Sequence, residues 1–481
     1  MVRWNGVCFL ARKGIGGGPL LNHQGMLLAI TPSGIEAGSP YSEWVWGRSE
    51  SENKENIVEC LSDNIPVLDD GRFFVDIPLK HQYQYLIIGG GLAGASAIEG
   101  IRQMDKTGSI GLLSAEEFLP YHRPPLSKDL LWGKKDFSQI FINDEAYYHR
   151  QKVELHLKIT VQNIRPDERF VVDEAGNHYG YSRLLLATGG SPRVLPKAGK
   201  TVRYFRNARD YQILAKALLN VEDFIIIGAG FIGAELSAAL SHLGKKVTML
   251  FKGKTLLENI FPADLADFVT NFYREKGIVF ITEDEPVRFD AWDDRVKVTT
   301  KTGRELEAGW VIAGVGIDSE TRLAESAGLR TDKGVVVDRY LQTSRPTIFA
   351  AGDLARFPCE ALGETIRFEH WDNAKAQGKC AGINMAGGSE PYVYLPFFYS
   401  DLFDLSFEAV GKLDSKMRTL TAWEDPFHKG VVVYLEDQKV KGVLLWGWPD
   451  QLDWARKLIA GQATPDSVED LKKMIPVFST V

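Results

Sequence analysis

The stretch Tyr85-Leu-Ile-Ile-Gly-Gly-Gly-Leu-Ala-Gly94 recurs in outline as Phe224-Ile-Ile-Ile-Gly-Ala-Gly-Phe-Ile-Gly233. Each copy predicts a buried parallel strand, a tight glycine turn and a helix that opens with small residues. In such a unit the first glycine turns the chain, the second lets backbone approach a pyrophosphate, and the third lets helix and strand pack closely. The helix N-terminus faces the negative charge. Because both copies have this context, they predict two dinucleotide-binding sites.

A β-α-β unit surrounds each glycine fingerprint. The predicted strand, helix and strand lie at 85–88, about 92–104 and 110–113 in the first unit, and at 224–227, about 231–243 and 246–251 in the second. Further segments, 181–190, 310–316 and 347–353, each combine a strand with a turn. The last ninety residues alternate apolar and polar side chains, which predicts antiparallel strands closed by a helix near 451–459.

The predicted fold class is α/β, with two Rossmann-type three-layer domains and a C-terminal α+β module that contains an antiparallel sheet. The expected boundaries are an N-terminal extension at 1–80, a discontinuous first nucleotide-binding domain at 81–205 and 317–394, a second at 206–316, and the C-terminal module at 395–481.

Composition excludes several classes of partner. The 481 residues are 44% hydrophobic and 25% charged, with a formal net charge of −7. This acidic balance argues against binding of nucleic acid or an anionic membrane by the whole surface. No uncharged apolar run is long enough to span a bilayer. We expect neither nucleic acid nor membrane as a partner.

The four cysteines, Cys8, Cys60, Cys359 and Cys380, are widely spaced. They form no C-x-x-C pair and no metal-ligand spacing, so we expect no metal site. A redox-active disulfide beside the first fingerprint would need two close cysteines, and the sequence has none there. Electrons that reach this site must leave it directly.

Residues 1–80 carry little periodic signal, and their first acidic residue is Glu36. A poorly ordered extension or leader explains this composition, and a transit peptide is the alternative. No convincing signal sequence is visible, and unpaired thiols indicate a reducing compartment. We therefore expect a cytoplasmic protein, with the mitochondrion as the minor alternative.

The residues after each unit's second strand indicate which ribose is bound there. In the first unit Glu116 can accept hydrogen bonds from ribose hydroxyls, or it only solvates a loop. The second unit has Lys252 and Lys254 at this place and no acid, which favours the 2′-phosphate of NADPH. Lysines are also common on any loop, so the choice between NADH and NADPH stays open.

Three segments resemble a known family: Pro120-Tyr-His-Arg-Pro-Pro-Leu-Ser-Lys-Asp129, Ala187-Thr-Gly-Gly-Ser-Pro-Arg193 and Ile348-Phe-Ala-Ala-Gly-Asp353. They are similar to the ferredoxin-reductase group of the FAD-dependent pyridine nucleotide-disulfide oxidoreductase superfamily. Within that group, the segments 396–401, 407–411 and 429–435 resemble the C-terminal module of apoptosis-inducing factor and its bacterial relatives. That module is of a dimerisation type, so a homodimer is possible.

The resemblance implies FAD in the first nucleotide domain and a nicotinamide nucleotide in the second. Matched motif by motif, it assigns to FAD Gly89, Gly91, Gly94, Glu116, Arg123, Lys128, Val161, Thr188, Gly189, Arg193, Asp353, Glu369, His370 and Trp371. It assigns to NAD(P) Gly228, Gly230, Phe231, Ile232, Gly233, Glu235, Lys252 and Gly316. The residues expected at the reacting centre are Lys128, Glu235, Phe231, His370 and Tyr399.

Individual roles have alternatives. Glu235 lies in an Ala-rich apolar helix, where a buried carboxylate is costly unless it is paired, and the family suggests Lys128 as its partner. The alternative is a solvated Glu235 on the outer helix face. Arg and Lys offset the charge that develops on a reduced flavin, but Arg193 alone could have an ordinary surface role. His370, beside aromatic residues, could be a packed structural histidine.

The chain departs from the family in two further places. Tyr399 stands where the family usually has Trp, and Tyr can still stack on a nicotinamide with less area. The long insertion of apoptosis-inducing factor is missing between Leu413 and Lys429. That absence weakens any inference of a role in cell death or DNA binding.

The expected function is transfer of electrons from NAD(P)H through FAD to an external acceptor, without a disulfide. The acceptor could be a ferredoxin-like iron–sulfur protein, or a quinone or other small molecule. The alternative is a slow-turnover NAD(P)H-sensing scaffold whose oligomeric state responds to flavin reduction. No motif marks the acceptor surface, so the sequence does not rank these functions.

Overall fold

The computed structural model describes residues 80–476, together with five short strands within the first 37 residues. Contacts divide the chain into two units, Met1–His81 with Val172–Tyr179, and Gln82–Val171 with Gly180–Val481. In the first unit, β1 (Val2–Trp4) pairs with β2 (Val7–Phe9), and β3 (Leu20–Leu21), β4 (Leu27–Thr31) and β5 (Gly34–Ala37) form a second antiparallel sheet. Most of the expected extension or leader lies outside the described residues.

The first nucleotide-binding sheet has the strand order β8-β7-β6-β11-β10-β9, with β23 also paired to β11. Its strands are β6 (His81–Ile88), β7 (Ile110–Ser114), β8 (Val153–Leu157), β9 (Val161–Arg165), β10 (Phe170–Asp173), β11 (His178–Leu186) and β23 (Ile348–Ala350). The three strands β8, β7 and β6 run parallel, and β23 runs parallel to β11. Strand β7 is buried throughout, and β6 is buried continuously over its last four residues, Tyr85–Ile88, as expected for the centre of a covered parallel sheet.

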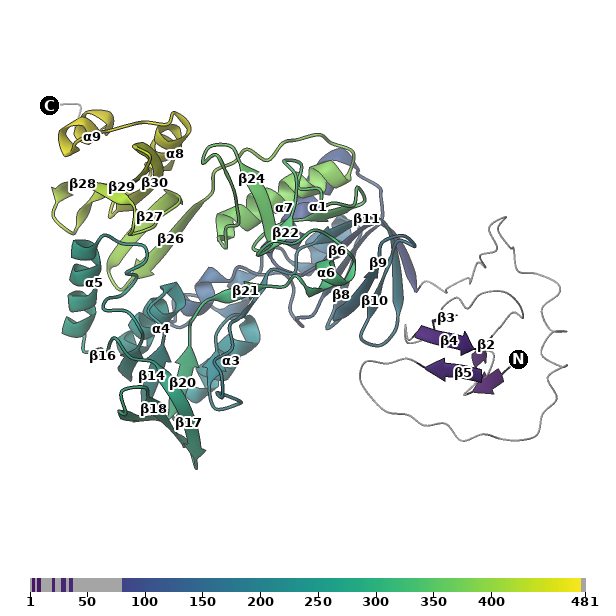
Figure 1. The fold of residues 1–481 in the computed structure, drawn as a ribbon, viewed down its shortest axis with the longest axis horizontal. Coiled ribbons are helices and arrows are strands. Elements are labelled where there is room, and N and C mark those ends of the chain that lie inside the picture. The colour runs from purple at the N-terminus through teal and green to yellow at the C-terminus, as the bar shows by residue number, and fades with distance from the viewer. Residues whose placement is uncertain are drawn as a thin grey trace. The chain divides into compact units, whose positions relative to one another are not determined.

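Helices α1 (Leu92–Met104) and α7 (Trp371–Met385) lie side by side on this sheet (Figure 1). Glycines bring them together. A side chain at Gly378 would overlap the carbonyl oxygen of Ala93, and one at Gly382 would overlap that of Ala97. The close helix pair joins two segments that are far apart in sequence, which makes the first nucleotide domain discontinuous.

The second sheet has the strand order β13-β20-β14-β15-β16, and its strands are all parallel. Its members are β13 (Arg203–Tyr204), β14 (Asp223–Ile227), β15 (Lys246–Leu250), β16 (Val279–Ile281) and β20 (Trp310–Ala313). Helices α3 (Ala208–Ala217), α4 (Phe231–His242) and α5 (Ala263–Glu275) belong to this part, as does the antiparallel sheet of β17 (Pro286–Trp292), β18 (Arg295–Thr300) and β19 (Glu305–Ala308).

The C-terminal sheet is antiparallel, with the order β26-β27-β30-β29-β28. It contains β26 (Phe397–Leu402), β27 (Leu405–Gly411), β28 (Arg418–Asp425), β29 (Lys429–Glu436) and β30 (Lys439–Trp446), followed by α8 (Leu452–Ala460) and α9 (Val468–Met474). Its aromatic side chains pack against the second nucleotide domain. Phe261 meets Trp446 edge to face at 5.5 Å, and Tyr434 donates to the carbonyl of Ile260 at 2.8 Å.

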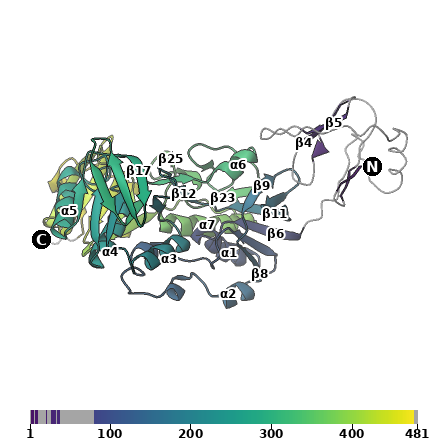
Figure 2. The same cartoon turned by 90° about the horizontal axis from the view of Figure 1, so that it is seen from below.

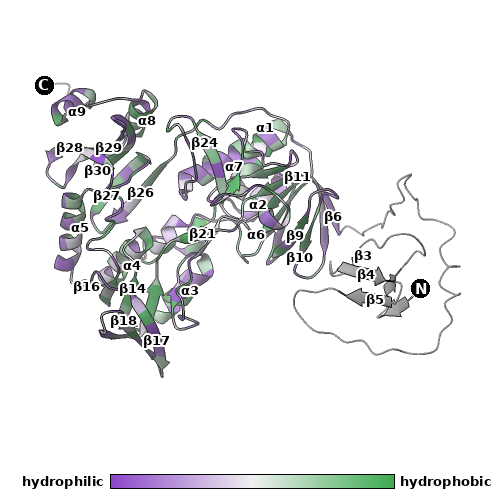
Figure 3. Ribbon diagram, in the orientation of Figure 1, coloured by the Kyte–Doolittle hydropathy of each residue, from purple (hydrophilic) through white to green (hydrophobic). Residues whose placement is uncertain are grey.

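Short elements connect these sheets. They are η3 (Pro124–Ser127), η4 (Phe137–Ile140), α2 (Glu145–Arg150), β12 (Gly190–Pro192), β21 (Ile317–Ser319), α6 (Arg322–Ser326), β22 (Val335–Val336), β24 (Ala355–Cys359) and β25 (Glu364–Ile366). The antiparallel pair of β12 and β21 links the two nucleotide-binding regions, and Figure 2 shows β12 between the two groups of strands. In Figure 3, green marks the hydrophobic residues, and many of them lie on the strands of these sheets.

The structure confirms the predicted α/β class with its C-terminal antiparallel module. Helix α1 has the predicted bounds, and β7, β14, α4 and β15 match their predictions to within one residue at either end. Helix α9 was not predicted. Within the described residues, no helix is long and apolar enough to cross a membrane.

Candidate active site

One cavity of about 1230 Å³ connects the two glycine fingerprints. It is lined by residues of the first fingerprint, by the loops after β7, β11 and β23, and by the start of α4 and of β26. Predicted site residues on its wall are Gly89, Gly91, Glu116, Arg123, Lys128, Val161, Thr188, Gly189, Asp353, Glu369, His370, Trp371, Gly230, Phe231, Ile232, Glu235, Gly316 and Tyr399. The predicted FAD and nicotinamide residues therefore face a common space.

The first and third glycines of each fingerprint serve the backbone. Gly89 and Gly228 have φ angles of +121° and +110°, where a side chain would be strained. A side chain at Gly94 would overlap the carbonyl oxygen of Gly89, and one at Gly233 would overlap that of Gly228. These four glycines hold each turn against its helix.

The second glycines leave the helix N-termini open. Gly91 and Gly230 are the N-caps of α1 and α4, and neither cap makes a side-chain hydrogen bond. No heavy atom lies within 4 Å of a Cβ built at either glycine. Both line the cavity, so the first-turn N–H groups are available to an anion. This arrangement fits a dinucleotide pyrophosphate at each fingerprint.

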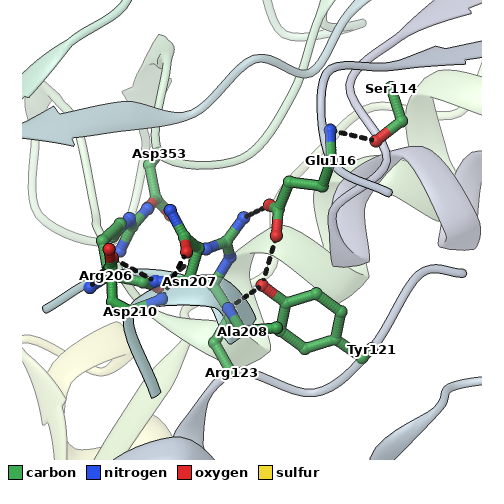
Figure 4. Close-up of polar contacts among 9 residues, drawn as sticks. All are labelled: Ser114, Glu116, Tyr121, Arg123, Arg206, Asn207, Ala208, Asp210 and Asp353. Carbon is green, nitrogen blue, oxygen red and sulfur yellow. Dashed lines mark hydrogen bonds and ion pairs between the residues drawn. The ribbon is translucent and has the colours of Figure 1, made fainter. Parts of the chain in front are cut away.

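The loop after β7 carries a carboxylate held by two neighbours (Figure 4). One Glu116 oxygen lies 2.5 Å from Nη2 of Arg123, and the other accepts a hydrogen bond of 2.5 Å from Tyr121. Arg123 also donates to the carbonyl of Arg206 at 2.7 Å. The Tyr121 hydroxyl also accepts a hydrogen bond of 2.8 Å from the backbone N–H of Ala208. Glu116 is therefore fixed at the cavity wall by two side chains of one segment, which is itself bound to Arg206 and Ala208.

Asp353 lies in the turn that follows β23, and its carboxylate forms an ion pair with Arg206. Its Oδ2 lies 2.6 Å from Nη2 of Arg206, and both side chains are mostly buried (Figure 4). Arg367 donates to the backbone carbonyl of Asp353 at 2.8 Å. The carboxylate of Asp353 is thus oriented into the cavity by a residue that the sequence patterns did not single out.

Glu235 is buried inside the site and has three donors. Its side chain is 7% exposed, and its Oε1 lies 2.9 Å from Nζ of Lys128. The same oxygen accepts 2.7 Å from Ser400, and Oε2 accepts 2.6 Å from Ser127. The structure rules out the alternative of a solvated Glu235 on the outer helix face. It brings Lys128 and Glu235 together, as the family resemblance implied.

Electrostatics keep Lys128 charged. Burial opposes its charged form, but the adjacent Glu235 carboxylate outweighs burial and raises the pKa of Lys128. The ammonium also lies 4.7 Å from the centre of the Tyr399 ring, a cation–π contact. Tyr399 keeps 39% of its surface exposed, which places its ring at the cavity margin.

An aromatic cluster forms the wall beside this ion pair. Phe231, the first residue of α4, meets Phe398 edge to face at 5.5 Å. His370 stacks on Phe398 with ring centres 4.3 Å apart. Desolvation lowers the pKa of His370 to about 4, against the opposing charge of Asp353. His370 is therefore neutral at pH 7 and packed, while it still lines the cavity.

The remaining cavity residues have simpler partners. Glu369 forms an ion pair of 2.6 Å with Arg367, and Trp371 donates to Nδ1 of His122 at 3.0 Å. Thr188 donates to the carbonyl of Glu320 at 3.3 Å. The other predicted lining residues are Val161, Gly189, Ile232 and Gly316. Their contact with a cofactor stays a prediction.

Five predicted residues are not part of the cavity wall: the backbone glycines Gly94, Gly228 and Gly233, and the side chains of Arg193 and Lys252. Arg193 forms an exposed ion pair of 2.8 Å with Asp318, with its guanidinium beside Gly316. Lys252 extends from the end of β15 and lies 2.5 Å from Glu285. The contacts of Arg193 are those of an ordinary surface residue, which was the alternative for this position. Lys252 lies on the exposed loop after β15.

The sequence patterns missed Ser127, Ser400, Arg206 and Tyr121. Ser127 and Ser400 do occur inside quoted motifs, between Pro125 and Asp129 and before Asp401, but a serine gives no signal of its partner. Arg206 stands in a polar loop that resembles any exposed turn. These residues become visible only when the fold brings distant segments together.

Among the described residues, no cysteine lines the cavity. Cys359 and Cys380, the cysteines whose side chains the structure describes, are buried and unpaired. Burial raises the pKa of both thiols, to about 12 for Cys380. In the described part of the chain, no pair of thiols is placed to carry electrons out of the site.

Comparison with known families identifies the group. Residues 83–378 match the family described as pyridine nucleotide-disulphide oxidoreductase. The chain belongs to this family. Residues 381–426 match a second family, the mitochondrion-associated C-terminal domain of apoptosis-inducing factor. Both matches confirm the resemblance found in the sequence motifs.

Similar proteins span most of the chain. Apoptosis-inducing factor 1, mitochondrial, of Dictyostelium discoideum is 33% identical, covering 82% of this chain and 80% of that protein. Putidaredoxin reductase of Pseudomonas putida is 30% identical, covering 78% and 91%. The crystal structure of a covalent putidaredoxin reductase–putidaredoxin complex superimposes with a TM-score of 0.76 at 28% identity, covering 84% of this chain and all of that chain.

Family membership and the cavity together establish the general activity. The protein is an FAD-dependent NAD(P)H oxidoreductase of the ferredoxin-reductase type. The predicted cofactors, FAD and NAD(P)H, are confirmed at this level. The contacts assigned to single residues and the domain boundaries stay predictions.

Proposed function

We propose that this oxidoreductase delivers electrons to a small ferredoxin-like iron–sulfur protein. The observation that carries the proposal is a single cavity that joins both nucleotide fingerprints and whose wall, over residues 80–476, contains no cysteine. Electrons then have no disulfide to pass through and must reach an external acceptor. The similarity to putidaredoxin reductase, whose solved complex contains putidaredoxin, supports a protein acceptor.

FAD, when bound, supplies the redox chemistry: it takes a hydride from NAD(P)H and gives up its electrons to the acceptor. The open N-terminus of α1 would hold its pyrophosphate. Glu116 would accept hydrogen bonds from the adenosine ribose, and Asp353 would hold a ribityl hydroxyl. Glu116 and Asp353 already have fixed orientations, because Arg123 and Arg206 hold them.

The residues around α4 would orient the nicotinamide. Glu235 keeps Lys128 charged and in place, so Lys128 would supply a positive charge to offset the negative charge of a reduced flavin. Phe231 and Phe398 close the apolar side of the cavity against water. Tyr399 offers a partly exposed ring on which a nicotinamide could stack.

The acceptor is tested by steady-state turnover of the purified holoprotein with each nicotinamide nucleotide. A [2Fe–2S] ferredoxin, a ubiquinone analogue and an oxygen-only sample are compared at equal enzyme concentration. We expect turnover with the ferredoxin to exceed turnover with the quinone by at least about tenfold. Faster turnover with the quinone contradicts the proposal and assigns a small-molecule acceptor.

A second candidate function rests on a different observation, the match of 381–426 to the C-terminal domain of apoptosis-inducing factor. In this case the protein is a slow NAD(P)H sensor whose oligomeric state changes when the flavin is reduced. Light scattering of the holoprotein, before and after anaerobic addition of NADH, tests it. A doubling of mass together with slow turnover of every acceptor supports the sensor, and an unchanged mass excludes this form of it.

We also propose a cytoplasmic location. The two described cysteines are buried, unpaired thiols, which fits a reducing compartment. Cell fractionation with an antibody to the native chain tests this location. Recovery of the protein with mitochondria would overturn it and favour the transit-peptide alternative for the first residues.

A further inference from the structure

The two nucleotide units repeat the same backbone hydrogen bonds at the end of their second strands. In the first unit, the N–H of Gly89 donates to the carbonyl of Leu113 at 2.8 Å. In the second, the N–H of Gly228 donates to the carbonyl of Leu250 at 3.0 Å. Each bond joins the first fingerprint glycine to the neighbouring strand, so Leu113 and Leu250 are equivalent positions.

A second pair of bonds extends this equivalence to the ribose position. The N–H of Lys158 donates to the carbonyl of Glu116 at 3.1 Å, and the N–H of Glu283 donates to the carbonyl of Gly253 at 3.0 Å. The donors also share an unusual backbone, since φ is +61° at Lys158 and +56° at Glu283. Glu116, the carboxylate expected at the FAD ribose, is therefore equivalent to Gly253.

The carboxylate that Gly253 lacks is supplied by another residue. A side chain built at Gly253 would coincide with the carboxylate of Glu258, which covers that face of the glycine. Glu258 is held there because its Oε2 accepts a hydrogen bond of 2.8 Å from the N–H of Lys254. The glycine leaves room for a carboxylate that arrives from five residues further along the chain.

We propose that Glu258 is the ribose-binding acid of the second site and makes the protein prefer NADH to NADPH. A carboxylate at this place accepts hydrogen bonds from the 2′- and 3′-hydroxyls of the adenosine ribose. It repels a 2′-phosphate at the same position. The inference rests on the nicotinamide nucleotide site but not on the identity of the electron acceptor.

The lysines beside the site do not create a phosphate pocket in this structure. Lys252 forms an ion pair of 2.5 Å with Glu285, whose other oxygen lies 2.9 Å from Lys301. These two lysines lower the pKa of Glu285, which stays ionised and offsets part of their charge. The backbone N–H of Lys254 holds a second carboxylate, that of Glu258, beside the same loop. The preference for NADPH suggested by Lys252 and Lys254 alone is therefore opposed by two carboxylates.

Direct binding tests this inference without any electron acceptor. Isothermal titration of the holoprotein with ADP-ribose and with 2′-phospho-ADP-ribose compares the two adenosine ends. We expect the wild type to bind ADP-ribose at least about tenfold more tightly. Glu258→Gln keeps an oxygen for the Lys254 N–H but removes the charge, and should reduce this ratio about tenfold. Steady-state ratios of kcat/KM for NADH and NADPH should change in parallel.

Two further variants separate a ribose contact from a structural role. Glu275→Gln, at the exposed end of α5, removes the same charge elsewhere and should leave the ratio unchanged. The double variant Gly253→Glu with Glu258→Ala moves the carboxylate to the position equivalent to Glu116 and should restore the preference for ADP-ribose. A wild type that binds the 2′-phosphorylated ligand more tightly, or a Glu258→Gln ratio equal to that of the wild type, would overturn the inference.

Discussion

The ammonium of Lys128 lies 2.9 Å from the carboxylate of Glu235, and both side chains are largely buried between η3, α4 and β26. Lys128 follows the proline-rich turn of the first nucleotide domain, whereas Glu235 belongs to the helix of the second. Ser400, from the C-terminal sheet, donates to the same carboxylate oxygen at 2.7 Å. One ion pair thus connects all three parts of the reductase at the reacting centre.

The charge of Glu235 should control the rate of flavin reduction. Glu235→Gln keeps hydrogen-bonding atoms for Ser127 and Ser400 but no longer compensates Lys128. We expect anaerobic reduction of the flavin by NADH to slow by about tenfold, because Lys128 loses the partner that positions it. Stopped-flow absorbance of the flavin measures the rate, with Glu275→Gln as the exposed control. An unchanged rate in Glu235→Ala would show that the pair has no role in this step.

Removing one charge of this ion pair should destabilise the protein, whereas replacing both residues with apolar ones should change its stability little. Glu235→Ala leaves a buried lysine without its carboxylate, and we expect the free energy of unfolding to fall by about 3 kcal/mol. Lys128→Met combined with Glu235→Leu removes both charges and should lie within about 1 kcal/mol of the wild type. Urea unfolding followed by circular dichroism measures these differences. A double variant as unstable as Glu235→Ala would refute the argument from an unpaired charge.

The two kinds of fingerprint glycine should respond differently to an added methyl group. A Cβ at Gly91 has open space around it, so Gly91→Ala should keep the thermal stability of the wild type. Its FAD affinity should fall about tenfold, because the methyl group would stand where the pyrophosphate is expected to approach. A Cβ at Gly94 overlaps the carbonyl oxygen of Gly89, so Gly94→Ala should unfold at a lower temperature. Fluorescence titration of the FAD-free protein and thermal melting separate the two effects. Equal loss of stability in both variants would contradict this division.

Much of the fold was predictable because glycine and apolar spacing constrain the backbone locally. The turns at Gly89 and Gly228 need positive φ angles, which few other residues adopt. The pairing of Glu235 was also predictable, since an acid in an apolar helix requires a partner. The partner itself came from family resemblance rather than from the helix.

The missed contacts depend on residues that are far apart in sequence. Ser127 and Ser400 reach Glu235 across 108 and 165 positions, and a serine is equally suited to an exposed turn. Glu258 lies close in sequence to Gly253, yet its position over the glycine depends on the path of the loop after β15. The sequence predicted no acid at the second ribose position, because the residues that directly follow β15 include none.

Acidification should destabilise the protein partly through His370. The pKa of His370 is lowered by desolvation to about 4 from the usual 6.5, so between these values the unfolded chain binds a proton that the folded chain does not. The contribution of the neutral His370 ring to the free energy of unfolding is fully present above pH 6.5 and is lost as the pH falls toward 4. For His370→Gln we expect a smaller loss of stability between pH 7 and pH 4.5, by at most about 3 kcal/mol. Urea unfolding at both pH values measures it, and parallel losses would exclude this role.

Arg206 should act on FAD through Asp353. The guanidinium holds Oδ2 of Asp353 at 2.6 Å, which orients the carboxylate expected to bind a ribityl hydroxyl. Asp353→Ala should weaken FAD binding by about tenfold or more, since it removes the acceptor. Arg206→Ala should weaken it less, and Arg206→Lys should recover part of the loss because a charge returns to the same partner.

Fluorescence titration of the FAD-free protein gives the affinities, and Arg288→Ala, which breaks an exposed ion pair with Asp290 away from the cavity, is the control. If Arg206 only stabilises the fold, its loss should lower the melting temperature of the FAD-free protein. In that case the FAD affinity of the remaining folded protein would equal that of the wild type. A positioning role predicts the reverse: a small change in melting temperature and a clear change in affinity. Adding Arg206→Ala to Asp353→Ala should then have no further effect on FAD affinity, because the group that Arg206 positions is already absent.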